Sequence, residues 1–147
     1  MKPLPEFNER GDLPEGVHAA TLKAALAHFG KTPRRSVVAR RLERIHALAA
    51  STDHLARFIV FGSFVTDKAE PNDVDIFLLM EDSFDVSKVS SEARLVFDHA
   101  AAQNLLGASV FWIRRAAAIG GEDATIAHWQ IKRDGGKRGI VEVMEHD

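Results

Sequence analysis

Two aspartates that flank a single valine, Asp73 and Asp75, stand at the start of an apolar run that ends at Met80. Side chains alternate along a strand, so both carboxylates would project from the same face of a sheet. Asp75 lies within the apolar run, where an unpaired carboxylate costs several kcal/mol and implies a partner or a metal. Magnesium prefers such carboxylates together with substrate phosphates. The pattern predicts that Asp73 and Asp75 bind a metal and take part in catalysis.

A glycine and a serine precede the two acids, because the short run Arg57–Phe61 ends at Gly62-Ser63. Glycine at the end of a buried strand lets the backbone approach a phosphate, and the residues after it can open a helix whose free N–H groups favour anions. Ser63 adds a hydroxyl donor, and Lys68 in the following turn could steer phosphate. The order strand, Gly-Ser, strand, Asp-x-Asp therefore predicts a site for a metal-bound nucleoside triphosphate. The structural alternative is an ordinary turn, with Lys68 simply exposed.

Residues 58–80 resemble the signature of the DNA polymerase β nucleotidyltransferase superfamily, in which Gly-Ser is followed on the next strand by Asp-x-Asp. The chain also resembles an uncharacterised bacterial family of small, antitoxin-type proteins of that kind, in the runs F-G-S-F-V-T-x-K, P-N-D-V-D and L-P-E-F-N-E-R-G-D-L-P-E-G-V-H. The resemblance implies a mixed sheet flanked by helices and transfer of a nucleoside monophosphate to a hydroxyl. Carried over by position, Gly62 and Ser63 would hold the triphosphate, and Asp73 and Asp75 would ligate Mg²⁺.

The chain departs from the superfamily pattern at its third carboxylate. Catalytic members resemble one another in carrying an acid on a later strand, and the matching strand here, residues 107–112, offers only Ser109. In a two-metal displacement that missing charge positions the metal of the nucleophile. Glu122, Asp123 and Glu142 are the acids that might replace it from the C-terminal region.

Two functions follow from this departure. The first is a magnesium-dependent nucleotidyltransferase with an unknown acceptor. The second is a catalytically inactive relative that acts as an antitoxin or regulatory binding protein, with a toxin as partner. RNA, as acceptor or as a ligand of an arginine-rich helix, and a homo-oligomer also remain open.

Composition limits the remaining classes of function. The 147 residues suit one domain, and the 46% hydrophobic and 27% charged fractions are those of an ordinary globular protein. No apolar run approaches the about 20 residues of a membrane helix, and no signal peptide opens the chain, so we expect a cytoplasmic protein. Cysteine is absent, and the histidines lack metal-ligand spacing. The net charge of −2 gives no general attraction to nucleic acid.

The elements that would position the site follow from periodicity and capping residues. Residues 1–18 predict an extended N-terminal arm, and residues 19–147 predict a single α/β (α+β) domain of the nucleotidyltransferase type, with a mixed sheet flanked by helices. Expected helices cover residues 21–30, 34–50, 90–104 and 123–132, and expected strands cover residues 57–61, 74–80 and 108–113. Residues 139–143 are either an edge strand or a short helix.

Five arginines lie on the second expected helix, and we read them as a mainly solvated face: Arg34, Arg35, Arg40, Arg41 and Arg44. Arg41 falls within the apolar arc and needs a partner there. Trp112 and Trp129 have the area for stacking on a base or for packing in the core. The turn formed by residues 135–138 lacks a phosphate-loop spacing, so we expect a surface turn.

Overall fold

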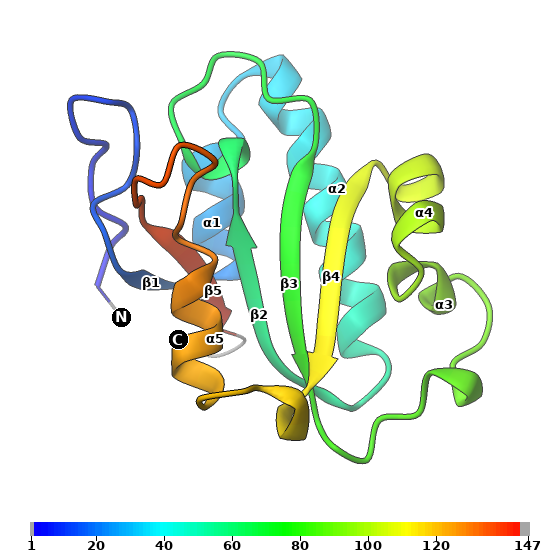
Figure 1. The fold of residues 1–147 in the computed structure, drawn as a ribbon. Helices are drawn as coiled ribbons and strands as arrows, with labels where there is room; N and C mark the ends of the chain where they lie inside the picture. Colours follow the sequence, from blue (N-terminus) through cyan, green and yellow to red (C-terminus); the bar gives the residue numbers. More distant parts are fainter. Residues whose placement is uncertain (1, 145–147) are drawn as a thin grey trace.

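A single five-stranded mixed sheet organises the chain in the computed structural model, which describes residues 2–144 (Figure 1). Its spatial order is β1-β5-β2-β3-β4. The strands are β1 (Val17–Thr21), β2 (Leu55–Phe61), β3 (Val74–Met80), β4 (Ala108–Arg114) and β5 (Ile140–Met144). β1 runs parallel to β5 and β3 parallel to β4, whereas β2 is antiparallel to both of its neighbours. The predicted α/β class and mixed sheet are confirmed.

The larger core lies between one face of the sheet and helices α1 (Leu22–Phe29) and α2 (Pro33–Ala50). Both helices begin at the predicted threonine caps: Thr21 accepts from the Ala24 N–H at 3.0 Å, and Thr32 accepts from the Arg35 N–H at 3.2 Å. Both lie behind the sheet in the view of Figure 1. The packing of α1 and α2 on this face of the sheet therefore holds the backbone of β3, at whose start Asp73 and Asp75 lie.

The opposite face of the sheet is covered by fewer helical residues. Helix α5 (Glu122–His128) packs there over a second core that includes Ile59 and Phe77. Figure 1 shows α5 in front of the sheet, beside β5 and β2, while the face of β4 is left open. Asp75 and Phe77 are two residues apart on β3, so both side chains point to this less covered face.

The expected third helix is broken into short pieces: α3 (Ala93–Val96), α4 (His99–Ala101) and a π-helical turn, η3 (Ala102–Leu106). Asp98 caps α4 by accepting from the Ala101 N–H at 3.1 Å. Capping starts a new helix at this point, which is why one continuous helix was wrong.

Two expectations about the ends of the chain also need correction. β5 is an interior strand between β1 and β2, not an edge strand or a helix. The N-terminal arm ends earlier than expected because β1 begins at Val17, and Leu13 of the arm is fully buried. No helix within residues 2–144 combines the length and the apolar composition that crossing a membrane would require.

Candidate functional site

Asp73 and Asp75 lie together on one wall of a cleft of about 620 Å³. The cleft opens at the end of the sheet where β2 finishes and β3 and β4 begin, at the upper end in Figure 1. Ten residues line it: Ser63, Lys68, Asp73, Asp75, Gln103, Ser109, Lys132, Arg133, Asp134 and Arg138. Four of the five residues predicted for the site are among them, and the fifth, Gly62, borders the cleft through Asp75.

Gly62 lets the Asp75 carboxylate lie against the backbone. Its φ of 80° is in the left-handed region, and a Cβ built there would lie 2.0 Å from Asp75 Oδ2. The expected helix after Gly62 is a single 3₁₀ turn, η1 (Ser63–Val65). Glycine is therefore needed here because any other residue would place a Cβ where the Asp75 carboxylate lies.

The surroundings of Asp75 disfavour its charged form. Burial, and then the neighbouring charge of Asp73, raise the pKa of Asp75 to about 6. Arg138, a hydrogen bond from Ser109 and Arg133 act in the opposite direction and do not cancel the shift. Within residues 2–144 no group of three or more His, Asp or Glu side chains is placed to hold a metal. Two carboxylates suit Mg²⁺ when phosphates supply further ligands.

The facing wall of the cleft comes from the segment between α5 and β5, which contributes three basic side chains and one acidic one, Asp134. Lys132, Arg133 and Arg138 line it. The expected surface turn is present, with Gly135 and Lys137 exposed, and only Arg138 of residues 135–138 reaches the cleft. Asp12, only 5% exposed, lies 3.3 Å from Lys132 Nζ and 3.6 Å from Arg138 Nη1. The N-terminal arm therefore fixes two of the cations that face the acids. The one sequence signal for this wall was the density of basic residues after Ile131.

Ser109 occupies the position at which a third carboxylate was expected. It pairs in register with Asp75 on the adjacent strand, and its hydroxyl donates to that carboxylate. Gln103 Nε2 in turn donates to Ser109 Oγ at 3.2 Å. The third position thus holds two neutral polar groups that orient Asp75.

The three acids considered as replacements lie elsewhere. Glu142 Oε1 lies 2.7 Å from Arg57 Nη2, and Glu122 and Asp123 also contact this guanidinium, at 3.3 and 2.8 Å. Arg57 pairs with Leu79, near the other end of β3 from Asp75. The expectation that one of these acids completes the site was wrong.

The family model described as Family of unknown function (DUF6932) matches residues 5–144. The chain belongs to this family. No curated protein and no solved structure matches the sequence. The DUF6932 match spans Asp12, both aspartates of the cleft and the basic segment, so every wall of the cleft lies within it.

Arginines of α2 support the loop that joins Ser63 to Asp73 in this DUF6932 chain. The buried Arg35 donates to the carbonyl oxygens of Phe29, Phe64, Thr66 and Lys68. Arg34 and Arg41 donate to Asn72 and hold the residue before the first acid. Reading these arginines as a solvated face was therefore wrong for Arg35, and the partner required by Arg41 is a backbone carbonyl.

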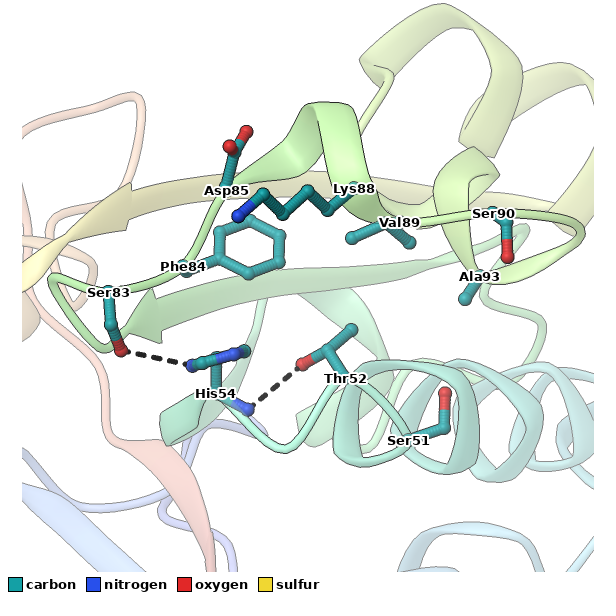
Figure 2. Close-up of a pocket in the computed structure, with 10 residues that line it drawn as sticks. All are labelled: Ser51, Thr52, His54, Ser83, Phe84, Asp85, Lys88, Val89, Ser90 and Ala93. Carbon is teal, nitrogen blue, oxygen red and sulfur yellow. Dashed lines mark hydrogen bonds between the residues drawn. The ribbon is translucent and has the colours of Figure 1, made fainter.

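A second cleft of the DUF6932 domain, of about 480 Å³, lies beside the C-terminal end of α2 and the loop after β3 (Figure 2). Ser83 Oγ and His54 Nδ1 are 3.1 Å apart there. A serine nucleophile needs its histidine oriented by a third group. Asp85, the carboxylate on this cleft, instead accepts from Ser87. The arrangement does not make a nucleophilic triad.

Proposed function

We propose that the chain binds a Mg²⁺–nucleoside triphosphate in the 620 Å³ cleft and transfers its nucleoside monophosphate to an acceptor hydroxyl. The observation that carries this proposal is the pairing of two walls: Asp73 and Asp75 on one side, and a basic segment on the other. A metal–triphosphate complex presents a cation and several anionic oxygens together, so it complements both walls at once.

Each wall has its own part in the proposed reaction. Lys132, Arg133 and Arg138 would hold the phosphates by charge, and the Ser63 hydroxyl would donate to one of their oxygens. Asp73 and Asp75 would hold Mg²⁺, which would neutralise negative charge on the phosphate oxygens around the phosphorus that is attacked. The acceptor oxygen forms a bond to the α-phosphorus, the bond to the bridging oxygen breaks, and pyrophosphate leaves. The acceptor proton passes to water.

The binding step is tested by calorimetric titration with ATP, GTP, CTP and UTP in the presence of magnesium. The wild-type chain should bind at least one of them, and Asp73→Asn with Asp75→Asn should abolish binding. A matched control, Glu122→Gln with Asp123→Asn, removes two carboxylates outside the cleft and should bind normally. Absence of binding to all four nucleotides by the wild type contradicts the proposal.

A second candidate function is favoured by one observation, the Ser109–Gln103 pair at the third position. With no third acid, the chain would bind the nucleotide without transfer and act as an antitoxin or regulatory partner of another protein. Incubation with labelled triphosphates and a candidate partner separates the two. Label on the partner supports the enzyme, whereas stable co-purification without label supports the silent binder.

A further inference from the structure

The charged cleft continues into an aromatic groove along the same face of the sheet. The groove, of about 520 Å³, lies along the edge strand β4. From this face it is lined by Phe77, Phe111, Ile113 and Trp129, with His99 beside them, and Phe97, Val110 and Trp112 complete its lining. Phe111 follows Ser109 by two residues on β4, a step of roughly 7 Å along a strand that keeps both side chains on one face. The floor of the charged cleft thus passes directly into the floor of the groove.

The other two walls are continuous in the same way. Gln103 lies against Ser109, and His99, one helical turn earlier, lies against Phe111 with ring centroids 4.9 Å apart. On the facing side, Lys132 lines the charged cleft, and Trp129, three residues earlier, lines the groove. The floor and both sides therefore change from charged or polar residues to aromatic residues along β4, from Ser109 toward Phe111.

Phe111 is the exposed ring of this groove. It retains 38% of its surface, although Trp129 packs against it at 5.2 Å and His99 at 4.9 Å between centroids. Phe77 also packs against Trp129, with ring centroids 5.1 Å apart, but it is buried. Phe111 therefore differs from Phe77 in being exposed to solvent beside the charged cleft. Planar bases bind such open rings by stacking.

We infer that the aromatic groove is the nucleobase subsite, with Phe111 as the stacking surface for a nucleotide whose phosphates lie between Asp75 and Lys132. This inference rests on the nucleotide binding proposed above. A ligand with an anionic end and a flat apolar end matches the two-part cleft, whereas inorganic phosphates fill its charged part alone. Phe111 is thereby assigned to the recognition of the base.

The test compares Mg²⁺–ATP with Mg²⁺–tripolyphosphate, which lacks base and ribose, by calorimetry on the full chain. Phe111→Ala and Phe111→Leu should weaken Mg²⁺–ATP binding by roughly 5- to 100-fold and leave Mg²⁺–tripolyphosphate binding unchanged. Phe111→Leu keeps apolar bulk against Trp129, so the fold is retained. Phe111→Tyr keeps the ring and should bind ATP as the wild type does. Leu105→Ala, at a residue 64% exposed that lines neither cleft, is the matched control.

The outcomes separate this inference from the function on which it rests. Equal loss of ATP and tripolyphosphate binding in Phe111→Leu would mean that the ring only supports the charged cleft, and would overturn the inference. Unchanged ATP binding in a folded Phe111→Leu would overturn it as well, while nucleotide binding stands. A wild type that binds neither ligand removes the proposed function itself.

Discussion

Acidic side chains gather at both ends of strands β2 and β3, and the two groups differ in what neutralises them. Near one end, Glu122, Asp123 and Glu142 surround Arg57, which forms ion pairs with all three. At the other end, Asp73 and Asp75 face an open cleft, and within residues 2–144 no salt bridge joins either of them to a basic side chain.

The difference distinguishes a structural cluster from a binding site. The acids around Arg57 have their counter-charge inside the protein, and their hydrogen bonds raise the pKa of the guanidinium further. Asp73 and Asp75 form no such ion pair, and the pKa of Asp75 is raised to about 6 although Arg138 and Arg133 act to lower it. A carboxylate charge that the fold neutralises only in part is one that an external cation can stabilise.

The largest expected effect comes from removing the internal counter-charge. Arg57→Met leaves Glu142 partly buried without a partner and should lower the free energy of unfolding by about 3 kcal/mol. The melting temperature should fall by roughly 6–12 °C. Nucleotide binding, measured well below that temperature, should not change. A loss of binding as large as the loss of stability would show that the two ends of the sheet are coupled.

A smaller effect is expected from adding a third acid to the cleft. Ser109→Asp places a like charge beside Asp75 and should destabilise the chain by about 2 kcal/mol in the absence of a divalent cation. Magnesium should restore the melting temperature. Ser109→Asn, which adds similar bulk without charge, should show no magnesium-dependent recovery. Appearance of transferase activity in Ser109→Asp alone would support the silent-binder function for the wild type.

Neutralising Asp75, in contrast, should raise the free energy of unfolding. The folded state holds the Asp75 proton up to about pH 6, whereas the unfolded chain loses it near its ordinary value of 3.8. The native state therefore binds more protons in this window, and stability falls as pH rises through it. Asp75→Asn should stabilise the apo chain by about 1.5 kcal/mol at pH 7.5 and by nothing at pH 3.5. Thermal melts at the two pH values, without magnesium, measure this difference.

The smallest effect belongs to the exposed member of the Arg57 cluster. Asp123 retains 91% of its side-chain surface, so its ion pair is screened by water. Asp123→Asn should change the free energy of unfolding by less than about 0.5 kcal/mol, as measured in urea. A change above about 1 kcal/mol would mean that this cluster works as a tightly coupled network.

Local sequence signals predicted the parts of the fold that depend on neighbours in the chain. The strand Val74–Met80 was expected at its observed bounds because seven consecutive residues suit a buried strand after a turn. The threonine caps of α1 and α2 act over three residues. Four residues that line the cleft could be predicted for the same reason, because they lie within one short segment: Ser63, Lys68, Asp73 and Asp75.

Contacts between distant residues explain what was missed. Strand β1 gains its hydrogen bonds from β5, more than 100 residues later, and its own residues have no strong strand pattern. The basic wall depends on Asp12 and Lys132, which are 120 residues apart. The aromatic groove needs rings from β3, β4 and the end of α5. No spacing rule within one segment relates such pairs.

The position of β5 has a consequence for how the protein is made. The last strand of the described chain lies inside the sheet, and β1 pairs with it alone. A ribosome releases β1 first, so that strand has no neighbouring strand to pair with until residues 140–144 emerge. Lys132, Arg133 and Arg138 directly precede β5 in the sequence, so a nascent chain that ends before them holds its two aspartates without the cations that face them.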